Sequence, residues 1–250
     1  MKKVLSILIT ALLPLFAGAQ EQLINDYSMI GVNYGVTFSN MYFSPSMHNR
    51  AYVVAPNYLS VQYTKHCKMF DSIPMFALVV GASMGNEGYA FKPDKETGAA
   101  AEVDGASWCS MKVFEMPAMA QIHVDVEPVK IMANAGIYGG YRQSITRRGS
   151  VDQQWTNAFK EYENRIDYGF QGGAGLGFIF DPIEIHFNCL VRWSWSSLYQ
   201  PDYKSSYYYN YAYPLDIMAT VGIHFHLTKR RGKTNRALKQ EAYETVYGKN

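Results

Sequence analysis

The chain has 250 residues, of which only 18% are charged, and its formal net charge is +2. This length fits one large β domain, although two smaller domains are not excluded. The small net charge, with no basic stripe and no zinc-ligand spacing, argues against a nucleic-acid partner. Aromatic residues make up 15% of the chain and include 20 tyrosines. Many aromatics and few charges are typical of a wall that faces lipid on one side.

Residues 1–19 predict a signal peptide. Lys2 and Lys3 form its charged region, residues 4–16 its apolar region and residues 17–19 a small-residue cleavage site, so the mature chain begins at Gln20. A polar lead-in follows over 20–28. The mature chain has no apolar run of about 18 residues, so no transmembrane helix is predicted. Its three cysteines fit neither a metal site nor a disulfide framework, and no cofactor is expected.

The rest of the chain alternates apolar and polar residues with a period of two, which predicts β-strands. In the clearest hairpin, at 165–199, Ile185 and Phe187 alternate with Glu184, His186 and Asn188. Its arms are longer than most soluble strands and match or exceed the roughly 9–11 residues of a tilted membrane strand. The predicted strands are 29–40, 58–70, 74–85, 109–126, 129–142, 166–180, 183–199 and 214–227.

The connections between these strands alternate between long and short. Three are tight turns, at Asp71-Ser72, Glu127-Pro128 and Asp181-Pro182, and the others are long polar segments. The pattern predicts an all-β fold, an eight-stranded antiparallel up-and-down transmembrane β-barrel over 29–227, with short periplasmic turns and long extracellular loops. Such a barrel lies in the outer membrane of a Gram-negative bacterium. The first and the last residues of the barrel segment (both barrel ends in the sense of the chain), and the basic tail 228–250, are then expected in the periplasm.

A soluble lipocalin-like ligand carrier is the alternative fold. It also has eight strands, but its apolar face lines a cavity and its outside is charged. The polar face here carries mainly Gly, Ser, Asn and Thr. These residues suit a narrow, packed lumen better than a soluble exterior, so we expect the membrane barrel.

Four short stretches and a set of glycines carry a family resemblance. They are Phe114-Glu115-Met116-Pro117, Asn134-Ala135-Gly136, Tyr138-Gly139-Gly140-Tyr141 and Asp167-Tyr168-Gly169, with the glycines at 172, 173, 175 and 177 and with Arg192. They resemble the PorT-like outer-membrane β-barrel family, in the broader OmpA/OmpX class of eight-stranded barrels. The resemblance covers about residues 29–227. It implies a surface barrel whose partners are outer-membrane lipid, lipopolysaccharide and a protein of an envelope or secretion complex.

Five charged residues fall on the inward face of the predicted strands, all in the outer half. Arg142 and Asp167 lie at similar heights on neighbouring strands, as do Arg192 and Asp216, and Glu115 completes the set. An eight-stranded lumen is only just wide enough for side chains. Buried charges there must pair and hydrogen-bond. We therefore expect an ion-pair network that plugs the lumen; a gate or proton path is the alternative interpretation.

Four histidines point inward in the opposite, periplasmic half: His123, His186, His224 and His226. Imidazoles on adjacent strands can hold Zn²⁺ or Cu²⁺. No local ligand motif supports such a site, so ordinary packing in the lumen is the expectation and no metal is predicted. The glycines at 169–177 lie mid-strand on one face, where they allow close packing rather than phosphate binding.

Aromatic residues cluster towards the outer ends of the strands. Tyr141, Trp193, Trp195 and Tyr199 are predicted to form an interfacial aromatic girdle. The last long connection is rich in tyrosine, and exposed tyrosines form adaptable contact surfaces. One interpretation is an external contact loop; the other is a last strand that extends above the membrane, with Tyr present for its β propensity. The tyrosines concerned are Tyr203, Tyr207, Tyr208, Tyr209 and Tyr211.

Three function classes fit these features. The expected one is a non-enzymatic barrel with a plugged lumen, which has a structural or protein-interaction role at the cell surface. The second is a lipid-modifying barrel enzyme, for which Ser46 and His48 in the first long connection are candidates. The third is a small-solute channel, which the narrow lumen disfavours.

Overall fold

The structure is a computed structural model that describes residues 27–69, 73–126, 128–200, 211–228 and 243. The predicted signal peptide and nearly all of the basic tail lie outside these ranges. Eight long strands dominate the described chain, with a two-residue strand β2 (Arg50–Ala51) and a short 3-10 helix η2 (Gln153–Trp155) in the connections. The long strands are β1 (Ser28–Ser44), β3 (Val53–Met69), β4 (Ile73–Phe91), β5 (Ala106–Val126), β6 (Val129–Gly149), β7 (Ile166–Phe180), β8 (Ile183–Ser194) and β9 (Tyr211–His226).

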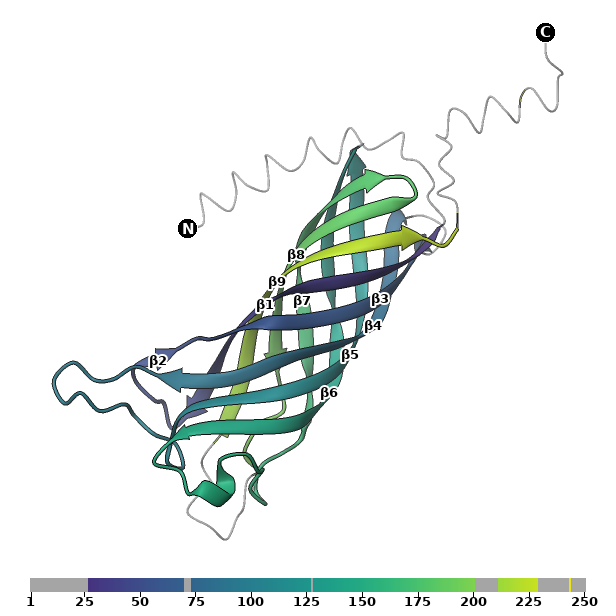
Figure 1. Cartoon of the computed structure of the whole chain (residues 1–250). Coiled ribbons are helices and arrows are strands. Elements are labelled where there is room, and N and C mark those ends of the chain that lie inside the picture. The colour runs from purple at the N-terminus through teal and green to yellow at the C-terminus, as the bar shows by residue number, and fades with distance from the viewer. Residues whose placement is uncertain (1–26, 70–72, 127, 201–210, 229–242, 244–250) are drawn as a thin grey trace.

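The eight long strands close into a ring (Figure 1). Each pairs antiparallel with the long strands before and after it in the chain, and β9 returns to pair with β1 from Met29↔His226 to Ser44↔Tyr211. β2 adds only a short pairing at the end of β4. The predicted all-β, eight-stranded antiparallel barrel is confirmed. No helix in the described ranges is long and apolar enough to cross a membrane.

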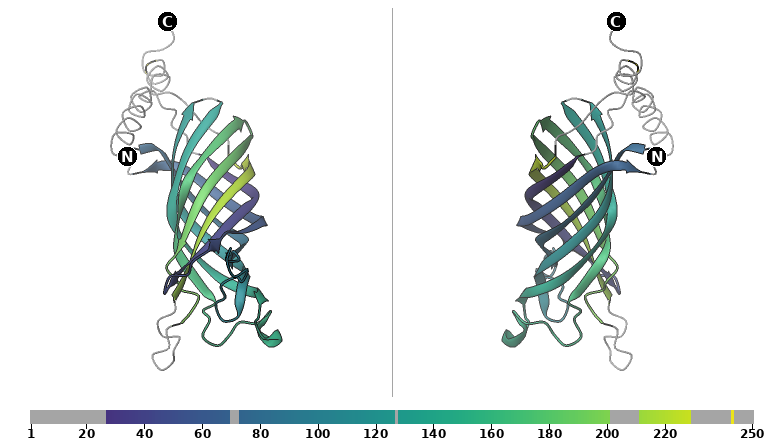
Figure 2. Two further views of the ribbon diagram at one scale, coloured as in Figure 1. Left: turned by 90° about the vertical axis from the view of Figure 1, so that its left-hand side faces the viewer. Right: turned by 90° about the vertical axis from the view of Figure 1, so that its right-hand side faces the viewer.

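The two ends of the barrel differ in their connections. At one end, here called the turn end, β3 joins β4, β5 joins β6 and β7 joins β8 through two or three residues. β1 also begins and β9 also ends there, as their pairing requires. At the other end, the loop end, the longer connections gather around η2 and β2 (Figures 1 and 2).

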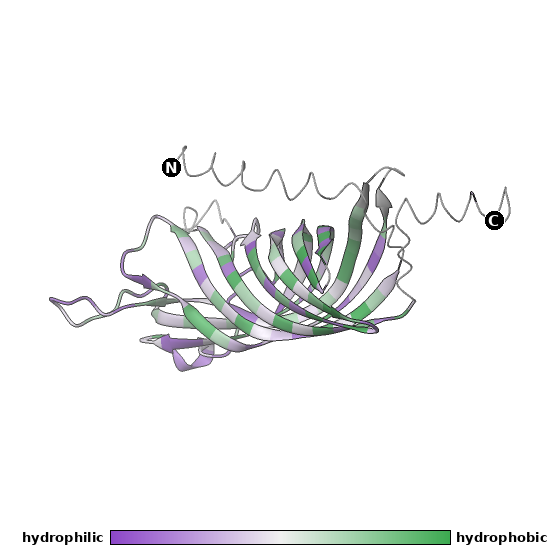
Figure 3. Cartoon of the chain, turned by 90° about the horizontal axis from the view of Figure 1, so that it is seen from above, coloured by the Kyte–Doolittle hydropathy of each residue, from purple (hydrophilic) through white to green (hydrophobic). Residues whose placement is uncertain are grey.

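Polarity alternates along each strand as the period of two predicts (Figure 3). The outward positions are large and apolar, for example Val32, Ile131 and Phe187, which are all more than two-fifths exposed. The inward positions are polar and buried, for example Asn33 and Gln62. A lipocalin-like carrier would show the opposite arrangement. The alternative of a soluble barrel around an apolar cavity is therefore wrong for this fold.

Most strands run further at the loop end than the sequence pattern predicted. β6 was expected to end at Arg142 but continues to Gly149, and there its faces exchange polarity: Ile145 is buried while Gln143 and Arg148 are exposed. The prediction ended where the outward apolar residues end. The ladder itself continues as an ordinary water-facing sheet around an apolar core. β7 begins at Ile166 as predicted, and β8 is shorter than predicted, because it ends at Ser194 rather than reaching Tyr199.

That apolar core, here called the loop-end core, fills the barrel above the polar lumen. Part of it comes from Tyr89 and Phe91 of β4, which were predicted to lie in a long loop over 86–108. The connection 150–165 closes over this region, because the buried Arg147 donates to the backbone oxygens of Trp155 (2.6 Å) and Ala158 (2.7 Å). The buried members of the core are Met41, Tyr89, Phe91, Ala106, Cys109, Met111, Ile145, Leu198, Tyr199 and Ala212.

Candidate functional site

Six charged side chains meet inside the barrel just below the loop-end core. The six neighbouring strands β4 to β9 each contribute one, and all six are at most 1% exposed. We call this set the ion-pair layer: Glu87, Glu115, Arg142, Asp167, Arg192 and Asp216. The sequence placed five of them in the lumen. It missed Glu87, because the predicted strand stopped at Gly85 although β4 continues to Phe91.

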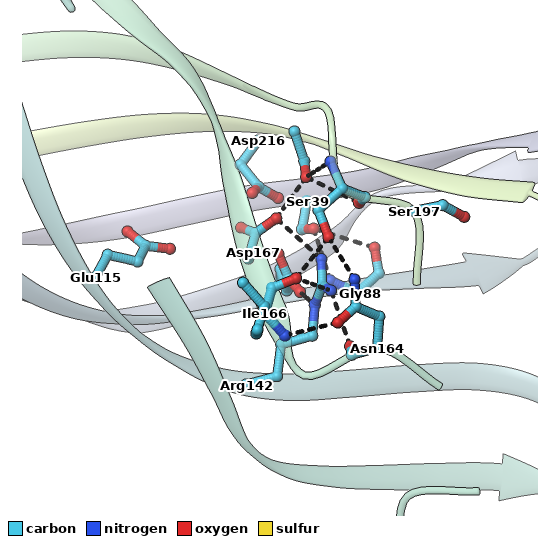
Figure 4. Close-up of polar contacts among 12 residues, drawn as sticks. Ser39, Gly88, Glu115, Arg142, Asn164, Ile166, Asp167, Ser197 and Asp216 are labelled. Atoms are coloured by element: carbon cyan, nitrogen blue, oxygen red, sulfur yellow. Dashed lines mark hydrogen bonds and ion pairs between the residues drawn. The ribbon is translucent and has the colours of Figure 1, made fainter. Parts of the chain in front are cut away.

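Arg142 uses its whole guanidinium within this layer (Figure 4). Its Nη2 donates to Asp167 at 3.0 Å, its Nε donates to Glu87, and its Nη1 donates to the backbone oxygens of Asn164 (2.9 Å) and Ile166 (3.2 Å). Charge-assisted bonds in such forks are among the strongest in proteins. The predicted pair Arg142–Asp167 is thus formed, and it also ties the connection before β7 to the barrel interior.

Arg192 forms the second centre of the layer. Its Nε and Nη2 donate to Asp216 at 2.9 and 2.5 Å, its Nη1 pairs with Glu115, and the Tyr138 ring lies 5.3 Å from its guanidinium carbon. Ser83 donates to the other oxygen of Glu115 at 3.2 Å. The predicted pair Arg192–Asp216 is formed as well. Each arginine therefore bridges two carboxyls from different strands.

The layer holds more acidic than basic groups, with four carboxyls and two guanidiniums. An isolated buried charge costs far more free energy than a paired one, so this arrangement depends on both arginines. Side chains from six strands thus meet inside the barrel and pair with one another. An ion-pair plug of the lumen requires such an arrangement.

A second polar cluster closes the turn end, and it is centred on the carboxylate of Glu184. This carboxylate accepts hydrogen bonds from Tyr27 (2.9 Å), Lys130 (2.6 and 2.8 Å), His186 (2.8 Å) and His226 (2.9 Å). We call these five residues the turn-end plug. The predicted lead-in was to extend to residue 28, but the Tyr27 side chain is completely buried in the plug.

Histidine rings pack around this plug. His66 stacks on Tyr27 with ring centroids 4.0 Å apart, His186 stacks on His224 at 3.9 Å, and His123 meets His66 edge-on at 4.8 Å. His66 joins the four histidines that the sequence placed there. In the described ranges, no three His, Cys, Asp or Glu side chains are arranged to hold a metal ion. The arrangement is that of packed rings in a narrow lumen.

Uncharged residues fill the lumen between the two clusters. Tyr58, Leu190 and Met218 form a small apolar contact cluster, and all three are at most 3% exposed. A small cavity between Tyr58 and His224 measures about 10 Å³, which is room for about one water molecule. On β7, a Cβ atom at Gly173 would overlap the backbone oxygen of Cys189. Close strand packing explains that glycine.

Residues 19–199 match the family described as outer membrane protein beta-barrel domain. The chain belongs to this family. No curated protein matches its sequence. Among solved structures, it is similar to Neisserial surface protein A, with 10% identity, a TM-score of 0.46, and coverage of 79% of this chain and 96% of that one. It is also similar to the N-terminal β-barrel domain of Pseudomonas aeruginosa OprF, with 10% identity, a TM-score of 0.39, and coverage of 81% and 99%.

In an outer-membrane barrel of this family, the outward aromatic residues face lipid. Tyr141, Trp193 and Trp195 are outward and about half exposed, and the Tyr42 ring stacks on Trp193 at 5.7 Å. Tyr199 was also predicted to lie in the girdle, but this is wrong. It is 4% exposed and belongs to the loop-end core, because β8 ends at Ser194 and the chain then turns inward.

The predicted contact loop is only partly within the described chain. Tyr203, Tyr207, Tyr208 and Tyr209 lie outside the described residues. Tyr211 does not lie in a loop: it is the first residue of β9 and pairs with Ser44 of β1. Here the second interpretation holds, since the last strand extends beyond the apolar band. Ser46 and His48, the candidates for enzyme chemistry, are exposed in the connection between β1 and β2.

Proposed function

We propose that this protein is a non-conducting, non-enzymatic surface barrel of the PorT-like type, which supports a protein complex in the cell envelope. The observation that carries the proposal is the filled lumen. The turn-end plug, the apolar cluster around Tyr58 and the ion-pair layer follow one another along its axis, and the loop-end core lies above them. Eight strands leave no room for a solute path beside such side chains.

The loop end then lies outside the cell. The start of β1 and the end of β9 lie in the periplasm, where a signal peptide cleaved before Gln20 would deliver the chain. Among the described residues, the strands at this end continue past the apolar band and enclose an apolar core, so this part of the end supports a rigid platform. Rigid platforms that carry binding segments are suited to protein partners. The partner implied by the PorT-like resemblance is a protein of an envelope or secretion complex.

Conductance of the purified full-length barrel in a planar lipid bilayer tests the filled lumen. We expect no stepwise current, while a sixteen-stranded porin reconstituted in parallel gives open-channel currents. Reproducible single-channel steps from the folded protein would refute the proposal. Protease treatment of intact cells tests the orientation: cleavage after Arg148 or Lys160 places the loop end outside, and cleavage there only after cell lysis would reverse it.

A further inference from the structure

The arginines of the described chain divide into two sets by the partners of their guanidinium groups. The buried set, Arg142, Arg147 and Arg192, pairs with carboxylates. The outer set stacks on aromatic rings and has no carboxylate partner among the described residues. Its guanidinium-to-ring distances are 4.8 Å for Arg50 over Tyr42, 4.6 Å for Arg148 over Trp108 and 4.7 Å for Arg165 over Phe159.

Arg165 sits at the edge of the apolar band. Its Nη1 donates to the hydroxyl of Tyr141 at 3.4 Å, and Tyr141 lies opposite Ile166 in the ladder between β6 and β7. Tyr141 and Ile166 are the last large apolar residues that face outward on these strands. Arg50 likewise rests on Tyr42, which stacks on Trp193. Both guanidiniums are therefore held at the height where lipid headgroups lie.

An open groove of about 510 Å³ adjoins Arg165. The groove is lined by Arg165 together with Trp155, Phe159, Lys160, Asn164 and Gln200, and also by Ile166, an exposed residue of the apolar band. Two acidic residues also line the groove. Glu163 forms a salt bridge with Arg147, whereas Glu161 is exposed to solvent. Aromatic faces, amides and a guanidinium that pairs with no carboxylate of the described residues are suited to a polar ligand with rings and an anionic group.

We propose that this groove binds the phosphate-bearing sugar headgroup of a glycolipid in the outer leaflet. This proposal rests on the proposed function in one respect, which is that the loop end, and with it the groove, faces the outer leaflet. The Arg165 guanidinium pairs with the phosphate, because its fork matches phosphate oxygens. The sugar lies against Trp155 and Phe159, and the acyl chains continue down past Ile166. A ligand in this position must have both a polar and an apolar part, which a soluble acidic peptide lacks.

Binding of defined lipids to the full-length protein in phosphatidylcholine nanodiscs tests this. The probes are diphosphorylated lipid A, the same lipid after phosphate removal, and phosphatidylglycerol. We expect Arg165→Ala to weaken lipid A binding about tenfold, as loss of one charge-assisted contact implies. Trp155→Ala should weaken lipid A binding but not phosphatidylglycerol binding. Lys95→Ala, an exposed lysine of the same barrel end away from the groove, is the matched control and should change nothing.

Equal affinity for the dephosphorylated lipid, or wild-type affinity in Arg165→Ala, would overturn the phosphate contact. If phosphatidylglycerol binds with the same affinity as lipid A, the assignment of the ligand as a glycolipid is wrong. A heat-dependent gel shift in every variant confirms that the barrel is folded. Nanodiscs expose both faces of the membrane, so these results do not depend on orientation or conductance. A failed lipid proposal is therefore distinguishable from a failed proposed function.

Discussion

Arg192 and Asp216 lie directly opposite each other in the ladder between β8 and β9, and their side chains meet inside the barrel at 2.5 and 2.9 Å. Both are almost completely buried. Removing one member of a buried pair leaves an uncompensated charge, which typically costs about 3–5 kcal/mol. The same guanidinium also bridges to Glu115, so the pair belongs to a network rather than standing alone.

Arg192→Met should therefore lower the free energy of unfolding by about 3–5 kcal/mol. Urea unfolding of the barrel in lipid vesicles, followed by tryptophan fluorescence, measures it. Arg148→Met is the matched control, because Arg148 is exposed at the loop end and the loss of its stacking on Trp108 should change stability by less than about 1 kcal/mol. Similar stabilities for the two variants would show that the ion-pair layer does not hold the lumen closed.

The excess of carboxyls over guanidiniums predicts the opposite result for an acidic residue of the same layer. Glu115→Gln removes one of four negative groups, while the amide oxygen can still accept from Arg192 and the amide nitrogen can donate to the Ser83 hydroxyl. We expect a change of less than about 1 kcal/mol, or a gain in stability, since like charges no longer repel in a buried site. The same unfolding experiment measures it. A loss as large as that of Arg192→Met would contradict the charge count.

Tyr27 and Glu184 are 157 positions apart, yet a hydrogen bond of 2.9 Å joins them across the turn end. Tyr27→Phe removes this donor and keeps the stacking on His66, so it should cost about 1 kcal/mol. Tyr27→Ala loses the ring as well and should cost about 3–5 kcal/mol. Tyr168→Phe, on the lipid-facing side of β7, is the control. Equal effects of the three substitutions would show that Tyr27 does not close the barrel.

The ring of eight strands and the two inner pairs could be predicted from the sequence, because both follow from the period of two and from counting residues to the nearest tight turn. Asp167 pairs with Gly140 in the ladder between β6 and β7, and Arg142 lies two residues further along β6, within reach of the Asp167 side chain. The approach failed for Glu87. Beyond the apolar band the outward residues become polar and the inward ones apolar, so the pattern used to recognise a strand ends before the strand does.

Tyr199 and Tyr27 show what the local pattern cannot supply. Tyr199 continues the outward alternation of Trp193 and Trp195, but the ladder that would hold it there stops at Ser194, and it packs in the loop-end core instead. Tyr27 precedes the first alternating strand, and its partner Glu184 lies on a strand far along the chain. Both contacts form only when the strands close into a ring, so they cannot be predicted from the spacing of residues within one strand.

The four tryptophans test where the membrane lies. Trp193 and Trp195 face outward within the apolar band, whereas Trp108 and Trp155 lie at the loop end. Brominated acyl chains should quench the fluorescence of a variant that retains only the first two, with Trp108→Phe and Trp155→Phe, and should leave the reciprocal variant nearly unquenched. Equal quenching of both would mean that the bilayer extends over the loop end, and that the polar outer positions of β6 are wrongly placed.

Cys109 tests the loop-end core. Its side chain is fully buried among apolar residues, and this burial raises the pKa of the Cys109 thiol above its usual range. The thiolate is the reactive form, so the folded protein should resist iodoacetamide between about pH 8 and 10, where an unfolded thiol ionises. Because the pKa of the Cys109 thiol is raised in the folded state, its contribution to the free energy of unfolding is complete below the ordinary thiol pKa. That contribution declines as the pH rises above the ordinary thiol pKa.

The measurement uses Cys67→Ser with Cys189→Ser, which leaves Cys109 as the single thiol, and compares alkylation rates before and after unfolding in urea. We expect the folded rate to be more than about a hundredfold lower at every pH in that range, since alkylation then requires the core to open. Ser150→Cys in a cysteine-free chain places a thiol on the exposed surface of the same end and should react at the unfolded rate in both states. If folded Cys109 reacts within tenfold of the unfolded chain, the strands beyond the apolar band do not enclose a stable core, and the loop end is not the rigid platform that the proposed function requires.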